Sequence, residues 1–386
     1  MKRVVFFFES VYPDNNAGSI RADFIIKAFK ATLPSLELVV LTGTVSPVAV
    51  GGVNFVSLSS PKSYKKTGFL KRALKELMLG FKAAKAYTKL KGDCDFIYIS
   101  SPSYLASMVL TSYSILSKAH YVFEIRDIYP QAFGYAGAIK ENGLIYKTFS
   151  FFSNLAYRRA ALNISATAGI AQMVEQSTPE SKNLVALNGF PASLIEVTSP
   201  KYDRFTLVFH GTLGLFQDVE LLCELVKELR KYDDIDVIVI GHGAKSELVE
   251  LSTKQSPSIR FLGSLNHKET IEVVSKCHVG LSFRFEDPLS YISFPVKNWE
   301  YLGLAIPSIV TPFGSEAGQF LESNGCGIQV KGGDIKAIVD AVLRLKSDGK
   351  YYQSYADSCK RIRTHYTREA ISGALVHNLS KEFANH

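Results

Sequence analysis

The chain has 386 residues, 47% of them hydrophobic and 21% charged, with a formal net charge of +8. This composition is ordinary for a folded protein and excludes a disordered chain, while the length favours two domains over one core. No apolar run reaches the roughly 18–20 residues that span a bilayer. The five cysteines are scattered and form no CxxC pair, which argues for a reducing cytoplasm and against a structural zinc site.

The first element is a short apolar run over residues 4–8 that ends at Glu9. It lacks the longer apolar region and the small-residue cleavage site of a signal peptide, so it predicts a strand. The glycine-bearing turn DNNAGSIRADF and a helix over residues 22–32 follow. A strand, a tight turn and a helix N-terminus can hold phosphate through backbone N–H groups, although glycine also occurs in such turns for steric reasons alone.

Residues 61–91 carry ten basic side chains and one acidic side chain, Glu76. Apolar residues recur among these cations at roughly helical spacing, from Phe69 to Phe81. A basic amphipathic helix of this kind suits an anionic membrane surface, and a solvated helix face packed on a core explains it equally well. No nucleic-acid recognition motif accompanies the charge, so we predict no nucleic-acid partner.

Strands and helices alternate twice along the chain, separated by a proline- and glycine-bearing connector over residues 187–205. The predicted strands after the first are 38–41, 54–58, 96–100, 121–125 and 162–165, then 206–210, 237–240, 259–262, 279–282, 308–310 and 328–330. Short apolar strands with helices between them predict parallel sheets covered on both faces. The fold class is therefore α/β with two Rossmann-like domains, residues 1–190 and 200–365, and a ligand site is expected at the strand carboxyl ends, in the cleft between them.

The second half also has a glycine-bearing turn, HGTLGLFQDVELL, after its first strand. Neither this turn nor the first matches GxGxxG or GxxxxGK[ST], so nicotinamide or ordinary ATP binding has no specific support. Asp93 and Asp95 in KGDCDFIYI precede their strand, which favours a polar turn over a metal site. We therefore expect no metal and no cofactor.

Several segments, taken in order, resemble the GT-B-fold nucleotide-sugar glycosyltransferases, specifically the retaining family 4 group. The segments are YPDNNAGSIRADFIIKAF, FEIRDIYPQAF, VFHGTLG, VIVIGHGAKSELVEL, IRFLGSLNHKETIEVVSKCHVGLSF, FPVKNWEYLGLAIPSIVT and YTREAISGALVHNLSKEF. The resemblance covers essentially the whole chain and implies a C-terminal helix, residues 366–386, that packs back on the first domain. It also implies transfer of a sugar from a nucleoside diphosphate sugar to a lipid-linked or oligosaccharide acceptor in bacterial surface-polysaccharide synthesis.

The resemblance assigns Glu300 to the ribose hydroxyls of the donor, because an ionised carboxylate is a strong acceptor for a vicinal diol. Lys297, one turn earlier, either reaches a donor phosphate or forms an i,i+3 ion pair with Glu300. Gly18 would allow close backbone approach to the donor, and Arg21 would point at its phosphate or be an exposed helix residue. The other implied donor-binding residues are Gly211, Thr212, Gly214, Gly241, Leu262 and Arg284.

On the acceptor side, the resemblance points to Asp127 as a positioning group for the acceptor hydroxyl, with Arg126 as its neighbour and alternative ion-pair partner. The chain departs from the family where a second glutamate is usual, because Ile292 stands there; Glu286 or Asp287 could take over that role. The usual cation of the donor turn is also missing. His210 and His242 end predicted strands, where a lone histidine is usually structural.

Two further functions stay open at this stage. One is a nucleotide-sugar epimerase of the same fold, which would act on a soluble substrate and need no membrane helix. The other is a non-catalytic GT-B subunit that binds a partner transferase or a membrane. For the transferase, the polyprenyl-linked acceptor and the basic segment 61–91 predict a cytoplasmic protein that is peripheral on the inner face of the cell membrane.

Overall fold

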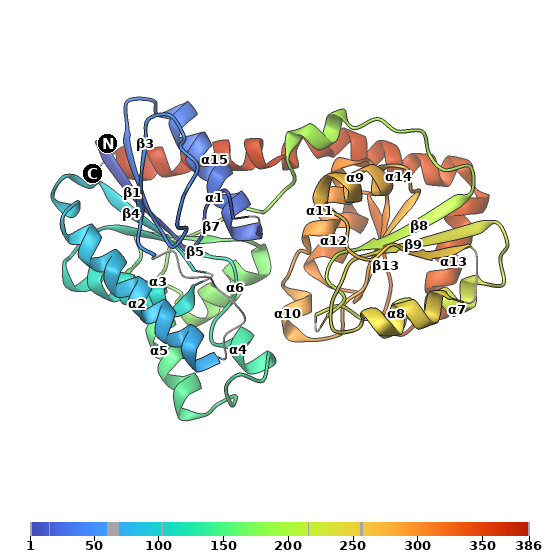
Figure 1. Cartoon of the computed structure of the whole chain (residues 1–386), viewed down its shortest axis with the longest axis horizontal. Helices are drawn as coiled ribbons and strands as arrows, with labels where there is room; N and C mark the ends of the chain where they lie inside the picture. The colour runs from blue at the N-terminus through green and yellow to red at the C-terminus, as the bar shows by residue number, and fades with distance from the viewer. Residues whose placement is uncertain are drawn as a thin grey trace. The chain divides into compact units, whose positions relative to one another are not determined.

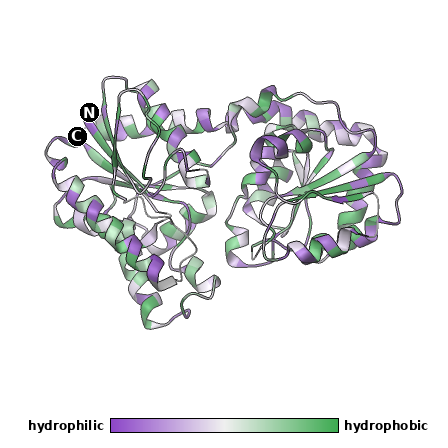
Figure 2. Cartoon of the chain, viewed as in Figure 1, coloured by the Kyte–Doolittle hydropathy of each residue, from purple (hydrophilic) through white to green (hydrophobic). Residues whose placement is uncertain are grey.

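The computed structural model describes residues 2–14, 16–59, 69–101, 103–214, 216–254 and 258–384. The chain divides into two compact units, unit 1 with residues 1–187 and 371–386, and unit 2 with residues 188–370 (Figure 1). Each unit has a parallel sheet covered by helices, as the alternation of strands and helices predicts. Hydrophobic residues concentrate on the strands inside each unit (Figure 2).

Unit 1 is built on a seven-stranded sheet with the order β3-β2-β1-β4-β5-β6-β7, in which every neighbouring pair is parallel. Its strands are β1 Arg3–Phe8, β2 Glu37–Thr42, β3 Val53–Ser57, β4 Phe96–Ser100, β5 Tyr121–Ile125, β6 Leu162–Ser165 and β7 Asn183–Val185. Its helices are α1 Ala17–Thr32, α2 Phe69–Thr88, α3 Tyr104–Leu116, α4 Gln131–Tyr135, α5 Leu144–Arg159, α6 Ala168–Ser177 and α15 Arg368–Ala384, with the 3-10 turn Lys91–Asp93.

Helices cover both faces of this sheet. Alternate strand residues such as Phe6 and Tyr98 share a core with α1 and α15, and Phe383 of α15 stacks on Phe96 with ring centroids 4.2 Å apart. The helices α2, α3 and α5 lie together on the other side (Figure 1), where the ring of Tyr157 on α5 packs 5.9 Å from that of Phe123. The side chains therefore alternate between two apolar layers, as expected for strands that are buried on both faces.

Unit 2 has a six-stranded parallel sheet with the order β10-β9-β8-β11-β12-β13. Its strands are β8 Phe205–His210, β9 Ile235–Ile240, β10 Ile259–Phe261, β11 Val279–Ser282, β12 Ser308–Val310 and β13 Gly327–Gln329. Its helices are α7 Val219–Leu229, α8 Ser246–Thr253, α9 His267–Ser275, α10 Pro288–Tyr291, α11 Val296–Gly303, α12 Glu316–Ser323, α13 Ile335–Ser347 and α14 Gly349–Ile362, with 3-10 turns at Ala192–Glu196 and Arg363–Tyr366.

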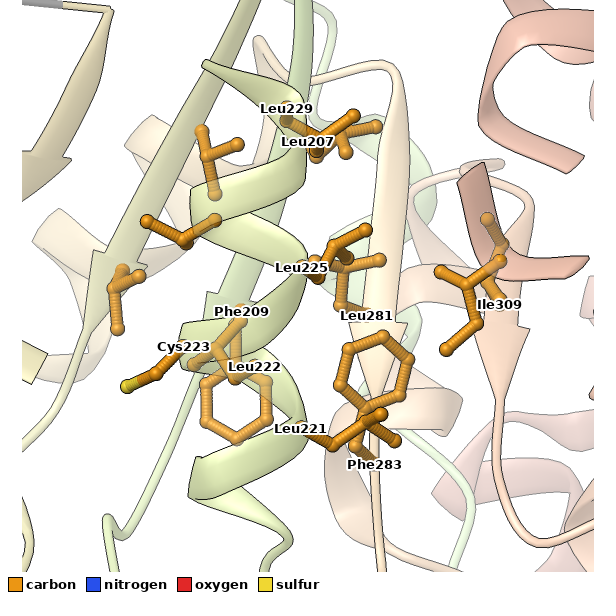
Figure 3. Close-up of a cluster of buried hydrophobic side chains, with 14 of the residues drawn as sticks. Leu207, Phe209, Leu221, Leu222, Cys223, Leu225, Leu229, Leu281, Phe283 and Ile309 are labelled. Atoms are coloured by element: carbon orange, nitrogen blue, oxygen red, sulfur yellow. The ribbon is translucent and has the colours of Figure 1, made fainter. Parts of the chain in front are cut away.

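The core of unit 2 forms between α7 and the central strands. Leu222, Leu225 and Leu229 recur at helical spacing and face Phe209 of β8 and Leu281 of β11 (Figure 3). Asp218 caps this helix, because its side chain accepts a hydrogen bond from the backbone N–H of Leu221. This packing fixes the turn between β8 and α7 against the sheet.

The predicted strands are confirmed, with ends that differ by a few residues, and the predicted helix over residues 22–32 is α1, which begins earlier, at Ala17. The sequence analysis missed β7, a three-residue strand at the sheet edge. Part of the basic segment, residues 61–68, lies outside the described residues. Most of the remainder forms α2, which begins at Phe69. Among the helices that the structure describes, none is both long and apolar enough to cross a bilayer.

Candidate functional site

The first candidate site lies at the carboxyl edge of the unit 2 sheet, beside the point where the strand order reverses between β8 and β11. Gly211 follows β8 and Gly241 follows β9, with φ values of +116° and +148°. A Cβ at Gly241 would lie 1.9 Å from the carbonyl oxygen of Gly211, and one at Gly243 would lie 2.2 Å from that of Leu213. The two turns therefore pack backbone against backbone, which only glycine permits.

The helix α11 carries Lys297 and Glu300 and is buried along most of its length. Trp299 stacks on Phe294 with ring centroids 3.9 Å apart. The hydroxyl of Tyr301 donates to the carbonyls of Val208 and Leu281, at 3.1 and 3.2 Å. These contacts fix α11 against β8 and β11, so its two charged side chains are held at the carboxyl edge of the sheet.

Glu300 is held by a histidine that the sequence analysis did not select. The Nε2–H of His267, the first residue of α9, donates to Oε1 of Glu300 at 2.8 Å, and His210 Nε2 lies 3.6 Å from Oε2. Burial would raise the pKa of Glu300, but the hydrogen bond from His267 and the charges of the nearby basic groups together outweigh burial, so this pKa lies below its usual value. Burial lowers the pKa of His210 to about 4, so its ring is neutral near pH 7.

Lys297 uses partners other than Glu300. Its ammonium donates to Oε1 of Gln217 at 2.9 Å and lies 3.6 Å from the ring centroid of Phe209. A Cβ at Gly211 would lie 3.7 Å from this Nζ, so the cation faces the turn after β8. Burial, followed by the nearby charge of Arg284, lowers the pKa of Lys297 to about 7. A buried amine with this pKa gains a proton readily when an anion approaches.

The loop after β11 holds the other predicted charged residues. Arg284 donates through Nε to Ser290 Oγ at 3.1 Å, and its guanidinium lies 5.8 Å from the ring centroid of Phe216. Glu286 is exposed and accepts from the backbone N–H of Gly332 at 3.2 Å. Asp287 caps α10 by accepting from the N–H groups of Leu289 and Ser290, so its carboxylate already has a structural role.

The remaining predicted donor residues also gather at this edge. Thr212 and Gly214 lie in the turn between β8 and α7, and Leu262 follows β10 with its backbone N–H bonded to Val239. Ile292, at the position where the family carries its second glutamate, is the C-cap residue of α10. Unit 2 thus brings together Gly211, Gly241, Lys297, Glu300 and Arg284 at one sheet edge.

The second candidate site is a cavity of about 600 Å³ in unit 1, at the carboxyl edge of its sheet. Its lining comes from the ends of β1, β2, β4 and β5 and from the N-terminus of α1, again where the strand order reverses. The polar side chains around it are Glu9, Ser10, Asp14, Asn16, Ser100, Arg126 and Asp127. Hydroxyl, amide and carboxylate groups of this kind suit a ligand rich in hydroxyls.

Arg126 is the cation of this cavity. A Cβ at Gly18 would lie 2.9 Å from its Nη1, so the missing side chain at Gly18 leaves room for the guanidinium. Burial lowers the pKa of Arg126 and raises that of Glu9. The Nε of Arg126 is buried without a hydrogen-bond partner among the described residues. The backbone N–H of Gly18 donates to Asn16 Oδ1 at 2.9 Å, so the helix N-terminus is capped by its own chain.

The prediction that Arg21 points at a donor phosphate needs correction. Its Nε donates to Glu124 Oε1 at 2.6 Å, and the same guanidinium donates to the carbonyls of Ala186 and Leu187, at 2.8 and 2.9 Å. Glu124 is buried on β5, and burial of an unpaired carboxylate would be costly. The sequence could not pair Arg21 with Glu124, because 103 residues separate them.

The two edges, one in each unit, differ in chemistry. Unit 2 offers an ionised carboxylate for a diol, a lysine and an arginine for anionic groups, and two glycine turns at the strand ends. Unit 1 offers a polar cavity with one cation and three carboxyl groups. Within the described ranges, no group of three or more His, Cys, Asp or Glu side chains is arranged to hold a metal ion.

Comparisons with known proteins bear on the fold. Residues 204–348 match the family model of group 1 glycosyl transferases. No curated protein matches the sequence. Among solved structures, HepE from Anabaena in complex with UDP is similar with a TM-score of 0.71 at 15% identity, covering 99% of this chain and 100% of that one.

Two other solved structures give the same result. Sucrose-phosphate synthase from Thermosynechococcus elongatus has a TM-score of 0.73 at 12% identity, with 100% of both chains covered. WaaG, a glycosyltransferase involved in lipopolysaccharide biosynthesis, has a TM-score of 0.68 at 11% identity, covering 98% of this chain and 99% of that one. The predicted fold class is thereby confirmed as GT-B, and residues 204–348 resemble a group 1 glycosyl transferase domain.

Proposed function

We propose that this protein is a glycosyltransferase that moves a sugar from a uridine diphosphate sugar to a saccharide acceptor, with retention of the anomeric configuration. The observation that carries the proposal is the group of Glu300, Lys297 and the Gly211–Gly241 turns at one sheet edge. Glu300 would accept hydrogen bonds from the ribose diol, while Lys297 and Arg284 would lie toward the diphosphate. Uridine is favoured because the similar protein HepE was crystallised with UDP and with UDP-glucose.

Departure of the nucleoside diphosphate places negative charge on its phosphate oxygens. Positive groups that are already in position stabilise this charge without reorganisation. Protonated Lys297 would supply one such group, and its buried position beside Gly211 strengthens the interaction because little water screens it. In a same-face transfer, the departing diphosphate takes the acceptor proton, so no protein base is required.

The unit 1 cavity is the proposed acceptor site, with Asp127 positioning the acceptor hydroxyl and Arg126 fixing the cavity's polar lining. We propose that the acceptor saccharide is carried on a polyprenyl lipid and that the product belongs to a bacterial surface polysaccharide. The enzyme would then work in the cytoplasm, at the inner face of the cell membrane. The involvement of the similar protein WaaG in lipopolysaccharide biosynthesis supports this choice.

The test is calorimetric titration of the purified protein with UDP, GDP and ADP, repeated on Glu300→Ala. We expect UDP to bind best and to lose roughly 1–3 kcal/mol on substitution, the usual loss for a hydrogen bond to a charged group. Glu247→Ala, on the exposed surface of α8, is the matched control and should bind UDP as the wild type does. If a folded wild-type protein binds none of the three nucleotides, the proposed donor site is wrong.

A further inference from the structure

An unusual set of large apolar side chains is exposed on two helices of unit 1. On α2, Leu74, Met78 and Phe81 are exposed, and Phe81 retains 65% of its accessible surface. Their i, i+4, i+7 spacing places them on one side of the helix, opposite the buried Leu79, Ala83 and Tyr87. The outer side of α2 is therefore an apolar stripe that the described part of the chain leaves uncovered.

The helix α5 repeats this arrangement, and nothing in the sequence analysis selected it. Leu144, Ile145, Phe151 and Phe152 are exposed, with Leu144 at 82% and Phe151 at 64%. Its inner side is formed by the buried Ser153, Ala156 and Tyr157. Monomeric proteins rarely expose several aromatic and aliphatic side chains together unless they mark an interaction site.

The two helices belong to one layer. Both α2 and α5 pack against α3, on the same side of the unit 1 sheet (Figure 1). We call the exposed apolar side chains of this layer, together with the basic residues of α2, the α2–α5 face. Two helices of one layer, each packed against α3, thus present a broader surface than a single helical stripe.

The positive charges of the α2–α5 face indicate an anionic partner. Among the described side chains of α2, every exposed charged one is basic, namely Lys71, Arg72, Lys75, Lys82 and Lys85. Glu76, the acidic residue of the helix, is buried and paired with Arg72 at 3.0 Å. Two copies of the same face would bring like charges together, which disfavours self-association. An anionic bilayer satisfies both features, because its interface accepts apolar side chains and its headgroups attract lysine.

We propose that the α2–α5 face docks on an anionic membrane surface, with Phe81 of α2 and Phe151 and Phe152 of α5 entering the interface. The basic helix alone would give only a weak electrostatic attachment that salt screens. The aromatic side chains of α5 add apolar burial, so two signals combine in one surface. The inference extends the lipid-linked acceptor of the proposed function, since such an acceptor lies in the membrane.

The test is co-sedimentation of the full chain with vesicles, without donor or acceptor. Vesicles of phosphatidylglycerol and phosphatidylcholine in equal parts should bind the protein, and vesicles of phosphatidylcholine alone should bind it at least about tenfold less. Phe151→Ser with Phe152→Ser, and separately Leu74→Ser with Met78→Ser, should each weaken binding to the anionic vesicles by about tenfold or more. All four side chains are exposed, so the fold should survive the changes.

A matched control makes the same chemical change elsewhere. Leu248→Ser with Leu251→Ser removes two exposed leucines from α8 of unit 2 and should leave vesicle binding unchanged. Equal binding of the wild type and the α5 double variant, or no binding of the wild type, would overturn the inference. Light scattering that shows dimers of the wild type but not of the α5 double variant would also overturn the inference, because the face would then join two copies of the chain.

UDP titration separates this inference from the proposed function. The α2 and α5 variants should bind UDP like the wild type, because the proposed donor residues lie in unit 2. If the wild type binds UDP but no vesicles, the proposed donor site stands and the docking face is wrong. If it binds vesicles but no nucleotide, the docking face stands and the proposed donor site is wrong.

Discussion

The imidazole Nε2 of His267 lies 2.8 Å from Oε1 of Glu300, joining the first residue of α9 to the middle of α11. The hydrogen bond to Glu300 raises the pKa of His267 above its ordinary value of 6.5. The half-exposed histidine therefore orients the buried carboxylate of Glu300 and, when protonated, balances its negative charge.

This pair predicts a pH dependence of nucleoside binding. Because the pKa of His267 is raised in the folded protein, its ionic pairing with Glu300 is present below the ordinary pKa and is lost as the pH rises through the raised one. A protonated His267 neutralises Glu300 and weakens its bond to a diol. The affinity for uridine, which has no phosphate, should therefore rise about three- to tenfold as the pH rises through the pKa of His267.

His267→Asn is the informative variant, because its amide can still donate to Glu300 but does not titrate. Uridine titrations followed by NMR should show a flat pH profile for this variant. A wild-type slope that the variant retains would assign the pH dependence to another group, such as His210.

Lys297 predicts the opposite pH dependence for the diphosphate. Its pKa in the free protein is about 7, so a bound diphosphate should raise that pKa and drive proton uptake. The advantage of UDP over uridine should then fall as the pH rises above about 7. Titration of UDP in two buffers with different ionisation enthalpies measures the protons taken up. The charged neighbours that set this behaviour are Arg284 and Glu300.

Lys297→Met should remove the proton uptake and lower UDP affinity by about tenfold or more while leaving uridine affinity near the wild-type value. Lys227→Met, at an exposed position in the last turn of α7, is the control. Equal losses for uridine and UDP would mean that Lys297 supports the whole site and does not contact phosphate.

Arg21→Met should destabilise unit 1 and leave UDP binding intact. Removing one member of a buried ion pair leaves Glu124 without its partner, which costs about 3–5 kcal/mol. Denaturant unfolding followed by fluorescence measures the loss, and Lys27→Met, which breaks the exposed pair with Asp23, should cost less than about 1 kcal/mol. A stable Arg21→Met protein with weakened UDP binding would restore the original phosphate role of Arg21.

Gly241→Ala should disrupt the donor edge. The new Cβ would overlap the Gly211 carbonyl, and the φ of +148° is unfavourable for alanine, so the two turns must separate. We expect a loss of at least about 2 kcal/mol in the stability of unit 2, and weaker UDP binding. Gly349→Ala, at the start of α14 with no atom within 4 Å of its new Cβ, should change neither. Unchanged melting and UDP affinity in Gly241→Ala would show that the turns are not under this constraint.

Much of the fold was predictable because its signals are local. The apolar strands over 96–100 and 279–282 and most of the helix α1 follow from runs and spacings of neighbouring residues. The strand β7 was not predicted, because three residues at a sheet edge are too few to show an apolar pattern. Glu300 and Lys297 stood out as charged residues in an apolar segment, whereas His267 had no such contrast in its polar surroundings.

By itself, the sequence determined two parallel α/β halves, the glycine turns after β8 and β9, and the placement of charge on α11, since each depends on residues close in the chain. Only the tertiary structure decided the partners of those charges. Arg21 meets Glu124, Glu300 meets His267, and α5 joins α2 in one layer, each across many residues of chain. Buried charges take whichever opposite or polar group the packing brings within reach, and that distance is a property of the folded chain.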